Sequence, residues 1–77
     1  MDKFFGKNLA QLRHAHNMTL QDVANQVGGV TRQGVFVWEH DNRAPKYVYL
    51  VRLAKVFNVD PQFFFTDLST TLEEGAP

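Results

Sequence analysis

The chain has 77 residues, a formal net charge of zero and no cysteine. A chain of this length can form one small domain, and the lack of cysteine excludes disulfide bonds and thiolate metal sites. No apolar run is long enough to span a membrane, and the N-terminus shows no signal-peptide pattern. We therefore expect a single cytoplasmic domain that does not bind membranes.

The charge is distributed unevenly along the chain. Residues 60–77 hold four acidic residues and no Lys or Arg, so residues 1–59 hold eight basic and four acidic residues, a balance of +4. A basic body with an acidic tail permits binding to nucleic acid, although any solvated surface also carries mixed charge.

Residues 4–16 place their apolar side chains at helical spacing and predict a first helix. His14 and His16 are two positions apart and do not share a helix face, which argues against a metal site there. Asn17 is a plausible left-handed residue at the end of this helix.

The following stretch opens with a helix start signal. Thr19 can cap a helix, and Asp22 three residues later gives a shortened capping box. The next apolar residues recur at i, i+3, i+4 and i+7 on one helix face, and they are Leu20, Val23, Ala24 and Val27. Gly28 and Gly29 end this second helix.

A third helix is predicted over about residues 31–39, with Val35 and Trp38 on its buried side. Two short helices joined by a glycine turn form a helix-turn-helix. Gly34 is unusual inside a helix. It allows either a close approach of DNA or a partner chain to the backbone, or relief of crowding against the second helix.

The remainder reads as a loop over residues 40–45, a fourth helix over about 46–57 and a short fifth helix over about 61–68 that begins at an Asp-Pro pair. No segment alternates with period two for long. The prediction is an all-α, compact five-helix domain over residues 1–68, followed by a flexible acidic tail over residues 69–77.

The stretch over residues 19–39 resembles the helix-turn-helix of the phage-repressor and Cro-like (XRE) transcription regulators, which commonly reads T-Q-x-E-L-A-x-x-L-G-V-S-x-x-x-I-S-x-W-E. The matching positions, once one extra glycine is allowed, are Thr19, Asp22, Val23, Ala24, Val27, Gly28, Val30, Thr31, Val35, Trp38 and Glu39. The later segments N-R-A-P and L-V-R-L-A-K-V-F-N-V-D extend the resemblance over about residues 5–66. It implies a repressor-like DNA-binding domain.

Four outward side chains of the third helix are the candidates for base reading. Arg32 can pair with guanine and Gln33 with adenine, whereas Phe36 and Val37 can pack against thymine methyl groups. The resemblance implies base contacts at the same four helix positions. Alternatively, Phe36 and Val37 mark a protein interface, or Phe36 turns inward over Trp38.

Phosphate contacts are assigned to Gln21, Thr31, Arg43 and Lys46. The alternative for each is a solvated polar surface residue, and for Lys46 this alternative is favoured. The family usually holds a phosphate with a glutamine just after the first threonine. That position is Leu20 here, so Gln21 would substitute from one residue later.

The resemblance also implies a structural ion pair between Arg13 and Glu39 that fixes the angle of the recognition helix. The alternative is a free surface Arg13 that contacts phosphate. The last two helices carry an excess of apolar residues. We therefore expect a homodimer interface that includes Val48, Tyr49 and Phe63. The alternative is that they are scattered exposed apolar residues, which are common.

The leading hypothesis is a sequence-specific regulator of transcription that binds double-stranded DNA as a homodimer, in the role of a repressor. The second hypothesis is a protein-interaction module that uses the same scaffold for a protein partner and does not read DNA. We expect no enzyme, cofactor or metal, because the sequence lacks a cysteine nucleophile, a glycine-rich phosphate loop and a carboxylate–histidine cluster.

Overall fold

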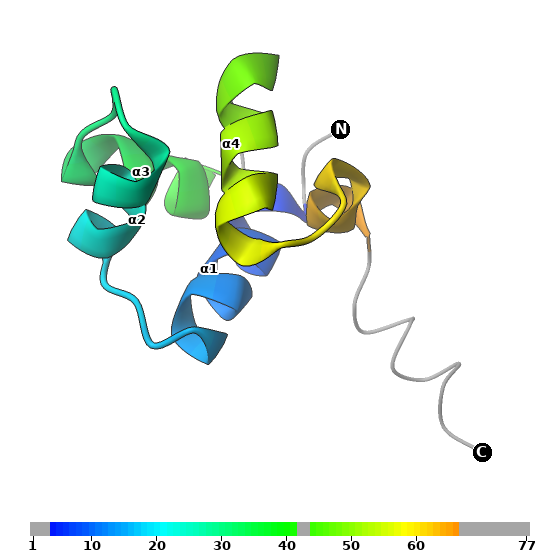
Figure 1. The fold of residues 1–77 in the computed structure, drawn as a ribbon. Helices are drawn as coiled ribbons and strands as arrows, with labels where there is room; N and C mark the ends of the chain where they lie inside the picture. Colours follow the sequence, from blue (N-terminus) through cyan, green and yellow to red (C-terminus); the bar gives the residue numbers. More distant parts are fainter. Residues whose placement is uncertain (1–3, 42–43, 67–77) are drawn as a thin grey trace.

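The computed structural model describes residues 4–41 and 44–66. Within these ranges the chain forms four α-helices, a short 3-10 helix and no strand (Figure 1). The elements in chain order are α1 (Phe5–Ala15), α2 (Leu20–Val27), α3 (Arg32–Asp41), α4 (Tyr47–Phe57) and η1 (Pro61–Phe65). The all-α prediction is confirmed, but the predicted fifth α-helix is a 3-10 helix. The tail predicted over residues 69–77 lies outside the described residues.

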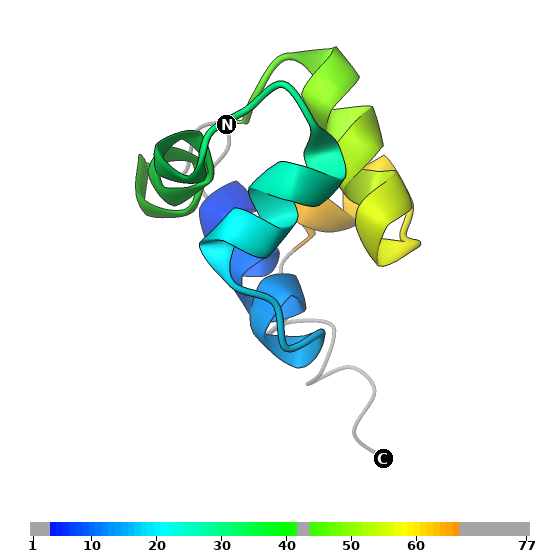
Figure 2. The same cartoon turned by 60° about the vertical axis from the view of Figure 1, so that its left-hand side comes forward.

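One hydrophobic core joins all five elements. In the bundle, α2 packs against both α3 and α4, α1 packs against α3 and η1, and α3 lies at one edge of the domain (Figure 2). The buried apolar side chains are Phe5, Leu9, Val23, Ala24, Val27, Val35, Leu50, Leu53, Ala54, Phe57 and Phe64. Because the core fills one side of α3, the other side of this helix remains open to solvent.

The connection from α1 to α2 follows the predicted signals. Asn17 adopts the left-handed conformation with φ +57°, and the Met18 N–H donates to the Arg13 carbonyl oxygen over 3.0 Å. The capping box is complete, since the Asp22 N–H donates to the Thr19 hydroxyl over 3.0 Å and the Thr19 N–H donates to the Asp22 carboxylate over 2.9 Å. These bonds satisfy amide groups that the start of α2 would otherwise leave unpaired.

Asn8 joins α1 to η1 and had no role in the sequence analysis. Its side chain is 1% exposed, and among the described residues it is the buried polar side chain of the core. The Asn8 Nδ2 group donates to the carbonyl oxygens of Phe63, Phe64 and Thr66, over 3.2, 3.0 and 2.7 Å. The Phe63 carbonyl oxygen also accepts from the Thr66 N–H over 3.2 Å. Because the last carbonyl groups of a 3-10 helix lack partners within the helix, the Asn8 amide supplies donors to this end of η1 and fixes it against α1.

The first prediction concerns this anchor. Asn8→Ala removes the amide donor from three carbonyl groups, of which Phe63 keeps the hydrogen bond from the Thr66 N–H. We therefore expect the free energy of unfolding to fall by about 1–3 kcal/mol. Urea unfolding followed by circular dichroism measures this change. Gln11→Ala removes an exposed amide from the same helix and should change the free energy of unfolding by less than about 0.5 kcal/mol. Equal effects of the two substitutions would contradict the anchoring role.

The second prediction concerns pH. The Thr19 backbone N–H, followed by the Thr19 side chain, lowers the pKa of Asp22 below its usual 3.8. Because this pKa is lower in the folded chain than in the unfolded chain, the ionised carboxylate contributes stability above pH 3.8, and this contribution is lost as the pH falls through the folded value.

Asp22→Asn keeps an oxygen acceptor and removes the charge. We therefore expect the wild-type chain to be more stable than Asp22→Asn near pH 6 and the gap to narrow at a second pH well below 3.8. Urea unfolding midpoints at both pH values measure the difference. A stability gap that stays constant with pH would show that the carboxylate charge has no part in the cap.

Candidate nucleic-acid interface

The outer side of α3 presents the four predicted base-reading residues together. Arg32, Gln33, Phe36 and Val37 are all exposed, whereas Val35 on the opposite side of the helix is fully buried. A separation of three or four residues returns to the same side of an α-helix, so these side chains form one continuous strip. We call this strip the α3 face.

The α3 face is half polar and half apolar. Phe36 is 40% exposed and Val37 is 37% exposed. The Phe36 ring does not turn inward over Trp38: it stacks on the His40 ring, with 3.9 Å between ring centroids, whereas the Trp38 ring lies against Tyr49 with centroids 5.8 Å apart. The inward-turning alternative for Phe36 is therefore wrong.

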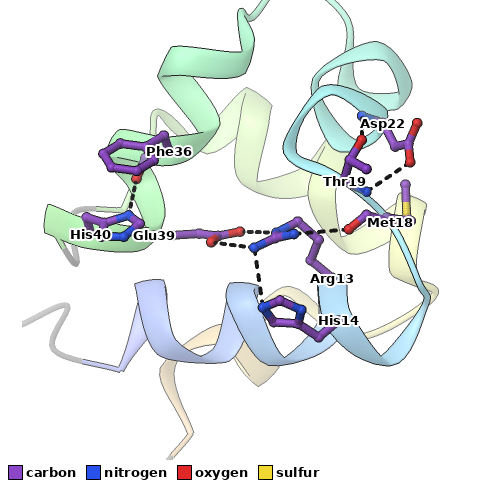
Figure 3. A network of polar contacts seen from close by, with 8 residues as sticks. All are labelled: Arg13, His14, Met18, Thr19, Asp22, Phe36, Glu39 and His40. Carbon is purple, nitrogen blue, oxygen red and sulfur yellow. Dashed lines mark hydrogen bonds and ion pairs between the residues drawn. The ribbon is translucent and has the colours of Figure 1, made fainter.

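Helix α3 is longer than the sequence predicted. Residues 40–45 were expected to form a loop, but His40 and Asp41 belong to the last turn of α3. A hydrogen bond between His40 Nδ1 and the Phe36 carbonyl oxygen (2.9 Å) and the stacking of the two rings support this turn (Figure 3). The turn-forming residues of this segment predicted a loop, but the pairing of Phe36 with His40 one turn later continues the helix.

The candidates for phosphate contact differ in their surroundings. Thr31 caps α3, since its hydroxyl oxygen accepts a hydrogen bond from the Gly34 N–H over 3.1 Å. Gln21 is exposed, and its side-chain amide donates to Asn25 one turn along α2 over 3.0 Å. Lys46 is exposed at the start of α4. Arg43 lies outside the described residues.

Gly34 is explained by local crowding. A Cβ atom at this position would lie 2.7 Å from Cγ2 of Val30, which is closer than such atoms approach in proteins. Val30 belongs to the turn that leads into α3, so the crowding is against this turn and not against α2, which one of the two alternatives in the sequence analysis had named. Absence of a side chain at Gly34 lets the turn fold back against the first turn of α3.

A two-point ion pair connects α3 to the rest of the domain. Arg13 Nε and Glu39 Oε2 lie 2.6 Å apart, and Arg13 Nη2 donates to Glu39 Oε1 over 3.2 Å (Figure 3). The same guanidinium donates from Nη1 to the Met18 carbonyl oxygen over 3.0 Å. The two side chains are only 14% and 4% exposed, respectively. This geometry joins α1, the turn before α2 and α3 at one point.

The glycine turn of the helix-turn-helix is held by α4. Gly28 and Gly29 both have positive φ angles, +78° and +74°, a conformation that favours glycine. Arg52 Nη1 donates to the Gly28 carbonyl oxygen over 3.2 Å, and the Tyr49 hydroxyl donates to the Gly29 carbonyl oxygen over 3.4 Å. Sequence reasoning missed Arg52, although its spacing of three from Tyr49 places both on one helix side.

The three residues assigned to a dimer interface do not share one environment. Val48 is 49% exposed on α4. Tyr49 is half-buried against the glycine turn, and Phe63 is half-buried with its ring edge-on to Phe64, at 6.3 Å between centroids. Of the three, Val48 offers the largest exposed fraction to a partner.

Over residues 4–41 and 44–66, no group of three or more His, Cys, Asp or Glu side chains could hold a metal ion, and no pocket opens on the surface. None of the helices in these ranges has the length and apolar character needed to cross a membrane.

Comparison with known families agrees with this geometry. A helix-turn-helix family model, HTH_3, matches residues 9–64, a span that starts within α1 and ends within η1. No curated protein and no solved structure shows significant similarity to the chain. The matched family consists of DNA-binding regulatory domains and is not an enzyme family. Since the match covers most of the chain, the protein belongs to the XRE family of helix-turn-helix proteins, of the Cro/C1 type.

Proposed function

We propose that this protein is a sequence-specific repressor of transcription that binds double-stranded DNA as a homodimer and acts in the cytoplasm. The observation that carries the proposal is the α3 face: a domain of a DNA-binding family exposes four adjacent side chains on the second helix of its helix-turn-helix. In this class of domain, that helix enters the major groove.

Arg32 and Gln33 would supply most of the hydrogen-bonding specificity. They are the first two residues of α3, the end of a recognition helix that approaches base edges. An arginine can donate two hydrogen bonds to guanine, and a glutamine can exchange two with adenine. Each such pair would contribute on the order of 1–3 kcal/mol of discrimination between bases.

Phosphate contacts would set the position of α3 in the groove. The amino ends of α2 and α3 favour anions, and Gln21, Thr31, Arg43 and Lys46 are the proposed side-chain contacts. The Thr31 hydroxyl uses its oxygen to cap α3 and keeps its proton available to donate to a phosphate. These contacts would add affinity without reading sequence.

The proposed homodimer would place two α3 faces in successive major grooves, about 34 Å apart. Val48, Tyr49 and Phe63 are its proposed interface residues. The exposed apolar surface of Val48 supports this role, whereas Tyr49 would contribute only the part of its ring that the glycine turn leaves open.

A second candidate function is a protein-interaction module that does not read DNA. The exposed apolar pair Phe36 and Val37 favours it, because a recognition helix usually carries more polar residues at these positions. DNA binding and protein binding make different predictions for salt, which the next experiment uses.

The third prediction tests DNA reading. Duplexes selected from a random pool should bind the chain, and the affinity should fall steeply as salt rises, because phosphate contacts release counterions. Arg32→Ala should weaken binding to the selected duplex by about tenfold or more and relax the preference at one base pair. Lys55→Ala removes the same charge from an exposed position on α4 and should leave base preference unchanged. Failure to bind any duplex at low salt would support the second candidate function instead.

The fourth prediction tests the homodimer. Val48→Lys places a charge on the exposed part of α4, so we expect the dimer to dissociate at least tenfold more readily, which corresponds to roughly 1.4 kcal/mol. Sedimentation equilibrium measures the dissociation constant of the dimer. Gln11→Lys, which adds the same charge at an exposed position on α1, is the matched control and should leave that constant unchanged. A wild-type chain that remains monomeric while bound to a two-half-site duplex would contradict the proposed dimer.

A further inference from the structure

His40 lies on the same side of α3 as the α3 face, beyond it toward the C-terminal end of the helix, although the sequence analysis placed it in a loop. Successive residues of an α-helix are rotated by about 100° about its axis. His40 therefore falls between Phe36 and Val37 on the side that also carries Arg32 and Gln33. It is exposed and belongs to the last turn of α3. The His40 side chain therefore lies next to the side chains that are proposed to read bases.

Phe36 and His40 form one rigid unit. Their ring planes are nearly parallel, inclined by 18°, with centroids 3.9 Å apart (Figure 3). His40 Nδ1 lies 2.9 Å from the Phe36 carbonyl oxygen. Since a carbonyl oxygen only accepts, Nδ1 carries a proton and donates it. The hydrogen bond fixes the imidazole against the helix, and the imidazole covers one side of the Phe36 ring.

A single exposed phenylalanine on a helix would exchange between rotamers and lose side-chain entropy when it bound a ligand. The stack restricts this freedom before binding while leaving the Phe36 side chain 40% exposed. The contact area with a thymine methyl group is small and apolar. Its contribution to the free energy of binding therefore depends on where the Phe36 ring is held. A ring positioned in advance avoids the cost of ordering at the moment of binding.

We propose that His40 is a positioning residue for base reading, which holds the Phe36 ring against the C5-methyl group of a thymine in the major groove. This inference rests on the proposed function, since it names the base that the apolar half of the α3 face reads. The methyl group distinguishes thymine from every other base and is displayed only in the major groove.

Replacement of thymine by uracil in a selected duplex tests the inference, because the substitution removes the methyl group and keeps base pairing. With the full wild-type chain, replacement at one position in one half-site should raise Kd about fourfold, the effect of one buried methyl group. We call the factor by which Kd rises on this replacement the thymine-to-uracil ratio. Phe36→Ala and His40→Ala should each reduce it below about twofold. A Phe36→Ala, His40→Ala double variant should show no further reduction, because the two residues act as one unit.

Two variants separate positioning from general stability. His40→Phe keeps a ring that can stack without an Nδ1 donor, and it should restore most of the thymine-to-uracil ratio. His16→Ala removes a different histidine–phenylalanine contact, with Phe57 on the other side of the domain, at 5.1 Å between centroids. It should leave the ratio unchanged, because loss of stability weakens binding to both duplexes equally.

The outcomes are distinguishable from those that test the proposed function. A thymine-to-uracil ratio that persists in His40→Ala, or that His40→Phe does not restore, overturns positioning by the stack. Sequence-specific binding with no dependence on any thymine methyl overturns the inference and leaves the proposed function standing. No binding to any duplex at low salt overturns the proposed function itself.

Discussion

The orientation of α3 depends on the ion pair between Arg13 and Glu39. The Glu39 side chain is 4% exposed, so its charge has exchanged water for the guanidinium almost completely. A carboxylate in this environment is stable only with its partner in place, because an uncompensated buried charge is costly. The planar guanidinium also imposes direction, since it meets both carboxylate oxygens and the Met18 carbonyl oxygen at once. Rotation of α3 about its axis would break both bonds between Arg13 and Glu39 together.

The helices could be predicted from the sequence wherever a local signal determined them. Periodic apolar residues gave α1, α2 and α4 to within a few residues, and short-range chemistry gave the Thr19–Asp22 capping box and the left-handed Asn17. The four outward positions of α3 followed from the same periodicity. In each case the determining contacts lie within four residues along the chain, which is the range that a sequence pattern can represent.

The features that could not be predicted depend on contacts between distant segments or on side-chain pairing. Asn8 and the η1 carbonyl groups are more than fifty positions apart, and nothing local in either segment indicates the other. The bond from the Tyr49 hydroxyl to the Gly29 carbonyl oxygen spans twenty positions, and the sequence predicted only an interface role for Tyr49. The extension of α3 through His40 was hidden by turn-forming neighbours, and the family resemblance gave no reason to expect a ring stack.

The Asn8 anchor makes two remote parts of the sequence depend on each other. A carboxylate at this position would present oxygen to three carbonyl oxygens, and a glutamine would carry its amide one methylene too far. Substitutions in α1 and in the η1 segment should therefore be accepted in pairs. Among related chains, asparagine at this place together with an Asp-Pro start should mark those that finish in a 3-10 turn, and another residue should accompany a regular α-helix. The Asn8 amide would thus serve as a sequence marker for the type of helix that forms at the η1 segment.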